Sequence, residues 1–151
     1  MELPEKAEIL LVEDNPNDVE LTERALKKHK LGVRMHVVRD GEQALDYIFC
    51  RNAFKDRNNK ELPKLILLDL KLPKVTGLEV LEKVKSNERT RNIPVVVLTT
   101  SREERDMVKS YELGANSYIV KPVDYNKFVD SVAEIGLYWL LMNEIPDYKS
   151  E

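Results

Sequence analysis

The sequence predicts an α/β fold of the (βα)5 type, in which a doubly wound parallel sheet of five strands carries helices on both faces. Two observations support this prediction. Short apolar runs alternate with longer segments of helical periodicity, and most of the runs are continuously apolar, as in strands covered on both faces. The five runs comprise residues 9–12, 33–38, 65–68, 95–98 and 118–120.

The five runs differ in pattern. Residues 9–12, 65–68 and 95–98 contain only apolar side chains, which predicts buried strands. Residues 33–38 alternate in part, because Arg34 and His36 interrupt the apolar residues. This pattern is typical of an edge strand with one face closer to water.

Capping residues mark the starts of the helices. Asn15 precedes Pro16, which places a favourable N-cap before a proline at the first helical position. Asp124 is expected to cap the last helix, whose buried face is an apolar stripe between Phe128 and Met142. The other helix starts carry pairs with the spacing of a capping box or a close relative of one: Asp40 with Gln43, Thr76 with Glu79, and Ser101 with Glu104.

Length and composition limit the function classes. The chain has 151 residues and a net charge of −3, which suits one domain and gives no basic excess for nucleic-acid binding. Its apolar runs are far shorter than the roughly 20 residues of a membrane span, and its acidic start does not resemble a secretory signal. The single Cys50 excludes an internal disulfide framework and a cysteine-based zinc site. We therefore expect a cytoplasmic protein that binds neither nucleic acid nor membrane directly.

Polar side chains follow the predicted strands at the points where they end. Glu13 and Asp14 follow the first run, and Asp69 follows the third. Thr99 follows the fourth run and Lys121 the fifth. Because parallel α/β sheets bind ligands at the carboxyl ends of their strands, we expect these side chains to form one site.

Carboxylates that converge at one edge repel one another unless a cation lies between them. Oxygen ligands without histidine or cysteine favour a hard ion, and a few carboxylates with water and phosphate suit Mg²⁺. Lys121 supplies a positive charge for an anion, and the hydroxyl of Thr99 can donate a hydrogen bond to it. A phosphoryl group satisfies this combination, and a carboxylate beside it can become an acyl phosphate.

Four short motifs resemble the receiver domain of two-component response regulators. The resemblance covers about residues 8–142, with the motifs in the family's order and each at the end of a predicted strand. It implies the flavodoxin-like strand order 2-1-3-4-5 and a single receiver domain across residues 1–151, with an extended C-terminal tail. The motifs are Leu-Val-Glu-Asp-Asn at 11–15, Leu-Leu-Asp-Leu-Lys-Leu-Pro at 67–73 with Gly77, Leu-Thr at 98–99, and Lys-Pro at 121–122.

The resemblance implies catalytic roles for three residues. Asp69 resembles the phosphoacceptor, which attacks the phosphohistidine of a sensor histidine kinase. Lys121 would pair with the phosphoryl oxygens, and Thr99 would donate a hydrogen bond to them. Pro122 follows the lysine as in the family, often after a cis peptide bond.

The resemblance also implies a Mg²⁺ site. Glu13 and Asp14 resemble the acidic pair that holds the ion, directly or through water, with Asp69 beside them. The backbone carbonyl of Lys71 would be a further ligand. The pair is Glu-Asp rather than Asp-Asp, a variant that should preserve metal binding.

Two residues are expected to form the switch. Thr99 would move toward the phosphoryl group, and Tyr118, three residues before Lys121, would then turn inward. Taken without the resemblance, Tyr118 is as readily explained as a packing residue of an edge strand.

The tail at residues 138–144 and the long loop at 51–64 are similar to those of regulators associated with phytochrome-type sensor kinases. We therefore expect a sensor histidine kinase as the partner, and the similarity indicates the phytochrome type. The extended last helix could also support a homodimer. The downstream target is not identified by the sequence.

Three other function classes share parts of this pattern. A Mg²⁺-dependent phosphatase that forms an aspartyl phosphate typically has a second Asp two residues after the nucleophile, where this chain has Lys71. A phosphate-independent adaptor would not need Asp69, Lys121 and the acidic pair. A flavodoxin-like cofactor binder shares the topology, but the acidic first turn would repel a phosphate. We therefore expect a signalling switch that catalyses only its own phosphorylation and dephosphorylation.

Overall fold

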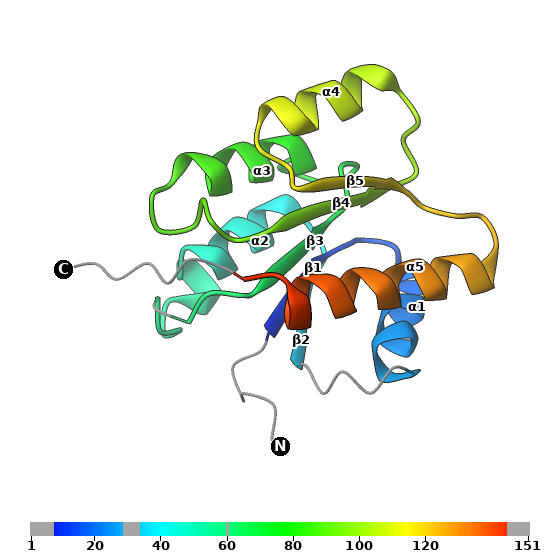
Figure 1. The fold of residues 1–151 in the computed structure, drawn as a ribbon. Helices are drawn as coiled ribbons and strands as arrows, with labels where there is room; N and C mark the ends of the chain where they lie inside the picture. Colours follow the sequence, from blue (N-terminus) through cyan, green and yellow to red (C-terminus); the bar gives the residue numbers. More distant parts are fainter. Residues whose placement is uncertain (1–7, 29–33, 60, 145–151) are drawn as a thin grey trace.

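The computed structural model describes residues 8–28, 34–59 and 61–144, and all structural statements concern these ranges. Five strands alternate with five helices, as predicted (Figure 1). The strands are β1 (Glu8–Val12), β2 (Arg34–Val38), β3 (Leu65–Leu68), β4 (Val95–Thr99) and β5 (Ser117–Val120). The helices are α1 (Pro16–Lys28), α2 (Gly41–Ile48), α3 (Gly77–Ser86), α4 (Glu104–Glu112) and α5 (Tyr125–Leu137).

The strands form one parallel sheet in the order β2-β1-β3-β4-β5, which confirms the predicted order. The order reverses direction between β1 and β3, because the chain crosses back over β1 after β2. Crevices at such a reversal are the usual ligand sites of open α/β sheets. The sheet therefore brings the ends of β1 and β3 together at this crevice. Val33, the predicted start of the second strand, lies outside the described residues.

Helices cover both faces of the sheet (Figure 1). On one face, α1 packs beside α5, and on the other, α2, α3 and α4 lie in a row. Successive strand residues point to opposite faces, so Ile9 and Leu11 belong to the α1/α5 core and Leu10 and Val12 to the α2/α3 core. The side chains on both faces of β3 and β4 are buried, which explains why these runs are continuously apolar.

Most predicted helix caps are confirmed. The side chains of Asp40, Thr76 and Asp124 accept hydrogen bonds from the backbone N–H groups three residues later. Asn15 likewise caps α1, since its Oδ1 accepts from the N–H groups of Asn17 and Asp18.

The expected cap at Ser101 is wrong. Helix α4 begins at Glu104, and its N-cap residue is Glu103. The hydroxyl of Ser101 instead donates to Asp106 Oδ2 at 2.6 Å and accepts from the N–H of Glu103. An acidic side chain in the first turn of α4 thus engages the serine, which becomes part of the loop between β4 and α4.

The apolar stripe of the last helix ends earlier than predicted. After α5, residues Tyr138–Met142 form a π-helical turn, which changes the angular spacing of the side chains. Leu140 is buried, but Met142 is 67% exposed. Pro146, the expected end of this helix, lies outside the described residues. No helix within the described ranges has the length and apolar character needed to cross a membrane.

Candidate functional site

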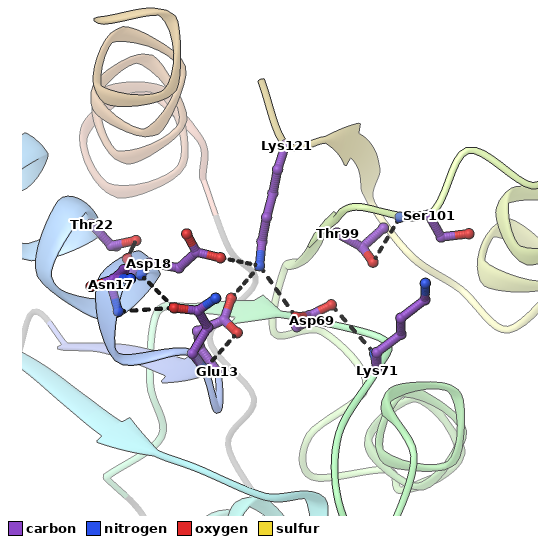
Figure 2. Close-up of polar contacts among 10 residues, drawn as sticks. Glu13, Asn17, Asp18, Thr22, Asp69, Lys71, Thr99, Ser101 and Lys121 are labelled. Atoms are coloured by element: carbon purple, nitrogen blue, oxygen red, sulfur yellow. Dashed lines mark hydrogen bonds and ion pairs between the residues drawn. The ribbon is translucent and has the colours of Figure 1, made fainter. Parts of the chain in front are cut away.

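Four of the predicted site residues lie together at the carboxyl edge of the sheet, and they are Glu13, Asp69, Thr99 and Lys121 (Figure 2). Backbone hydrogen bonds between neighbouring chain segments continue for one residue beyond the ends of the strands. The N–H of Glu13 donates to the carbonyl of Val38, the N–H of Asp69 to that of Val12, and the N–H of Lys121 to that of Thr99. These bonds fix where each functional side chain leaves the backbone, because each residue is held by the end of a neighbouring strand.

Three carboxylates form a cluster at the reversal point of the sheet. Glu13, Asp14 and Asp69 each offer an oxygen atom, and these atoms lie within 4.8 Å of one another. Glu13 and Asp69 are 3% and 7% exposed, whereas Asp14 faces solvent. Two buried anions this close are unfavourable without a nearby cation.

The Lys121 ammonium is the cation that this structure provides. Its Nζ lies 2.5 Å from Glu13 Oε1, 2.8 Å from Asp18 Oδ2 and 3.2 Å from Asp69 Oδ2 (Figure 2). An ammonium has three N–H donors, so each has one carboxylate partner. The lysine is thus held in the centre of the site.

Asp18 is the site residue that the sequence analysis missed. It is the third residue of α1, in the turn that follows the first strand, and its side chain is only 21% exposed. An acidic residue in the first turn of a helix is normally explained by its favourable interaction with the helix dipole. The sequence therefore gave no reason to place Asp18 in the site. A usable signal was that α1 starts directly at the site, so its first turn borders the acidic cluster.

Burial and charge shift the pKa values of this cluster in defined directions. Burial and the nearby charge of Asp69 together raise the pKa of Glu13 to about 7, although the hydrogen bond and charge of Lys121 act in the opposite direction. Burial alone would lower the pKa of Lys121, but its hydrogen bonds to Asp18 and Glu13 outweigh that effect and raise it. The ammonium therefore stays charged, while one buried carboxylate resists ionisation.

The loop after β3 approaches Asp69 closely. The backbone N–H of Lys71 donates to Asp69 Oδ1 at 3.3 Å, while the lysine side chain is exposed. Gly77 allows this fold of the loop, since a Cβ atom there would lie 2.3 Å from the carbonyl oxygen of Asp69. The backbone around Lys71 is thereby held beside the carboxylate.

Thr99 and Tyr118 are connected through the loop between β4 and α4. Thr99 is fully buried, and its Oγ1 accepts a hydrogen bond from the N–H of Ser101 at 3.3 Å. The hydroxyl of Tyr118 donates to the carbonyl oxygen of Ser101 at 3.0 Å. Ser101 thus joins the side chain of Thr99, at the end of β4, to the ring of Tyr118 on β5.

The peptide bond before Pro122, which is often cis in the family that the sequence resembles, is not cis in this structure. No peptide bond is cis in the part of the chain that the structure describes, so Lys121 and Pro122 are joined by a trans bond. Trans is the lower-energy isomer even before proline, and the position of Lys121 is reached without the cis form.

The donor set of the cluster fits a divalent cation. Its ligand atoms are carboxylate oxygens alone, which hard ions such as Mg²⁺ or Mn²⁺ prefer. Glu13, Asp14 and Asp69 together carry more negative charge than the Lys121 ammonium neutralises. Such an excess at a partly open site favours binding of a further cation.

Comparisons with known proteins agree with this geometry. Residues 9–133 match the response regulator receiver domain family. The chain is 44% identical over 138 residues to a probable methanogenesis regulatory protein, FilR2, of Methanothrix harundinacea, and the match covers 91% of this chain and 86% of the relative.

Two solved structures are similar over nearly their whole length. The phosphorylated cyanobacterial phytochrome response regulator RcpA has a TM-score of 0.87 and 38% identity, and the match covers 93% of this chain and 99% of that one. The Mn²⁺-bound form of the response regulator Rcp1 has a TM-score of 0.86 with the same identity and coverage. The match in sequence, in strand order and in length establishes that the chain belongs to the response regulator receiver domain family.

Proposed function

We propose that this receiver domain is a phosphorylation-controlled switch in which Asp69 accepts a phosphoryl group from a sensor histidine kinase. The observation that carries the proposal is the position of Asp69. Its carboxylate is buried beside Glu13 and Asp14, and it shares the Lys121 ammonium with Glu13. A carboxylate in such a setting combines a metal site with a counter-ion for phosphate.

In the proposed reaction, a carboxylate oxygen of Asp69 forms a bond to phosphorus while the bond between phosphorus and the kinase imidazole nitrogen breaks. Lys121 pairs with the phosphoryl oxygens that lie beside Asp69. Glu13, Asp14, Asp69 and the carbonyl of Lys71 would hold Mg²⁺. The bound ion would supply positive charge to phosphoryl oxygens during transfer.

The proposed switch uses the link from Thr99 to Tyr118. Phosphorylation adds about two negative charges. The Thr99 hydroxyl moves toward the new group to donate a hydrogen bond to it, and this movement takes the hydroxyl away from its present contact with the N–H of Ser101. That change displaces the loop whose carbonyl holds the Tyr118 hydroxyl. Phosphate thus biases an equilibrium between two arrangements of α4 and β5.

The chain is a receiver domain rather than a conventional enzyme, and we propose that its chemistry is confined to its own phosphorylation and dephosphorylation. Lys71 occupies the position where an aspartyl-phosphate phosphatase has its acid/base, and its side chain faces solvent. An exposed ammonium at this position does not supply the proton transfer that turnover of external phosphate esters needs. The position of Lys71 supports the switch over the phosphatase.

For the partner, we propose a phytochrome-type sensor histidine kinase in the cytoplasm. The support is the similarity to RcpA, which is described as a cyanobacterial phytochrome response regulator.

We propose direct contact with protein partners only, with neither nucleic acid nor membrane bound by this chain. A single receiver domain with a core at residues 8–142 remains our proposed organisation.

We also propose that a second copy of this chain covers the end of α5. Four large apolar side chains there are between 46% and 67% exposed within one short segment. Exposed apolar residues concentrated in this way are typical of interaction surfaces. They are Leu137, Tyr138, Leu141 and Met142.

The phosphoacceptor is tested with Asp69→Asn. With acetyl phosphate and Mg²⁺, we expect the wild-type chain to gain one phosphoryl group in intact-mass measurements and the variant to gain none, because an amide is a poor nucleophile. Asp130→Asn is the matched control on the exposed face of α5 and should behave as wild type. Undiminished labelling of Asp69→Asn would assign the chemistry to another residue.

The pKa of Glu13 predicts how metal binding depends on pH. A carboxylate with a raised pKa holds its proton more tightly, and a metal ion binds only after that proton leaves. Since the pKa of Glu13 is raised to about 7, the Mg²⁺ association constant should fall as the pH drops below that value, approaching about tenfold per pH unit. Isothermal titration calorimetry between pH 5.5 and 8.5 measures it. Glu13→Gln should bind Mg²⁺ more weakly and lose this dependence, and an equally steep profile in the variant would contradict the assignment.

The switch is tested with Thr99→Ala and the control Thr100→Ala, its exposed neighbour. In nuclear magnetic resonance spectra, beryllofluoride with Mg²⁺ should shift the amide signals of α4 and β5 in the wild type and in Thr100→Ala. In Thr99→Ala, the signals beside Asp69 should still shift while those of α4 and β5 stay largely in place, because the hydroxyl that displaces the loop is missing. A full response in Thr99→Ala would reject the link.

The dimer is tested by analytical ultracentrifugation. We expect a wild-type dimer and at least about a tenfold weaker association for Leu141→Lys, because a charge replaces a central apolar contact. Val108→Lys introduces the same charge at an exposed site on α4 and serves as the control. A strictly monomeric wild type, with and without beryllofluoride, would exclude a homodimer.

A further inference from the structure

The three partners of Lys121 fall into two groups. Glu13 and Asp69 belong to the carboxylate cluster with the geometry of a metal site. Asp18 does not belong to it, although its Oδ2 lies 2.8 Å from Nζ. The same ammonium is therefore shared between metal-binding carboxylates and one carboxylate outside the cluster (Figure 2).

We propose that Asp18 is a positioning residue that retains the Lys121 ammonium when a divalent cation takes up Glu13 and Asp69. This inference rests on the proposed metal-dependent function. It assigns to α1 a direct part in keeping the lysine beside the phosphoacceptor.

Electrostatics supports this division. A divalent cation bound by Glu13 and Asp69 competes with Lys121 for their negative charge, and it repels the ammonium. Lys121 is buried, with its side chain 6% exposed, and a buried charge without a partner is strongly unfavourable. Asp18 is the remaining carboxylate among the partners of Nζ in the described residues, so it offers a contact that metal binding does not remove.

The local structure of α1 leaves the Asp18 carboxylate available for this role. Capping of the helix is already performed by Asn15, whose Oδ1 accepts from the N–H groups of Asn17 and Asp18. The carbonyl of Asp18 accepts from the hydroxyl of Thr22 at 2.7 Å, which further fixes this turn. The side chain projects from this turn toward Lys121 rather than back to the helix end (Figure 2).

The role predicts a specific energetic coupling. Without metal, Lys121 retains Glu13 and Asp69 if Asp18 is lost, so the metal-free protein is affected little. With metal, Lys121 competes with the cation for Glu13 and Asp69, and loss of Asp18 removes its carboxylate partner outside the metal cluster. Removing Asp18 should therefore weaken metal binding, and it should do so only where Lys121 is present.

A double-mutant cycle separates this mechanism from simple attraction between Asp18 and the metal ion. Mg²⁺ affinity is measured by calorimetry at pH 8 for the wild type, Asp18→Asn, Lys121→Met and the double variant. We expect Asp18→Asn to weaken binding by about fivefold or more with Lys121 present, and by less than about twofold in the Lys121→Met background. Equal losses in both backgrounds, or no loss in either, would overturn the proposal.

Two further variants control for local structure. Glu20→Gln removes an exposed carboxylate on the same helix, where it pairs with Arg24, and should leave Mg²⁺ affinity within about twofold of wild type. Asp18→Glu should recover part of the affinity lost in Asp18→Asn. If Asp18→Asn lowers the unfolding midpoint of the metal-free protein as much as that of the Mg²⁺-loaded protein, Asp18 is merely structural and the proposal fails.

The outcomes also separate this inference from the proposed function. If the wild type binds Mg²⁺ and Asp69 accepts phosphate while the cycle shows no coupling, only the role of Asp18 is rejected. If the wild type neither binds Mg²⁺ nor is phosphorylated, the proposed function fails, and the role of Asp18 fails with it.

Discussion

The site depends on the presence of a single buried ammonium among several carboxylates. Glu13 and Asp69 are nearly inaccessible to solvent, and their mutual repulsion at this depth would oppose folding. Lys121 offsets that repulsion by contacting both, and its burial is in turn possible because it has carboxylate partners. Each charge is therefore tolerated only because the others are present. Such a cluster responds strongly to any change of charge, which is the property that a phosphate-controlled site requires.

The topology of the sheet is what makes this arrangement possible. Glu13 and Asp69 are far apart in sequence, but β1 and β3 are neighbours because the chain crosses over after β2. Hydrogen bonds beyond the strand ends then fix the backbone of Glu13, Asp69 and Lys121. Apolar packing on both faces of the sheet stabilises the strands. The free energy gained from this burial offsets the unfavourable free energy of holding several charges at one edge of the sheet.

How much could be predicted from sequence differs between the fold and the site. Continuous apolar runs report burial on both faces, so the strands were predicted almost to the residue. The convergence of Glu13, Asp69 and Lys121 followed because parallel strands end at one edge. Asp18 could not be predicted in this way, since its role depends on where the first turn of α1 points. Ser101 was assigned wrongly for a similar reason: its spacing to Glu104 suited a cap, but Asp106 competes for its hydroxyl.

The loop between β4 and α4 explains how a charge at the site can alter a distant surface. Ser101 uses all of its hydrogen-bonding groups: its N–H contacts Thr99, its carbonyl accepts from Tyr118, and its hydroxyl contacts the first turn of α4. A displacement of Thr99 therefore cannot be absorbed locally, because the same residue holds both β5 and α4. The N–H of Lys121 is also bonded to the carbonyl of Thr99, so the cation and the hydroxyl that would contact a phosphoryl group are joined through the backbone. In the proposed switch, these shared contacts make the rearrangement of α4 and β5 concerted rather than gradual.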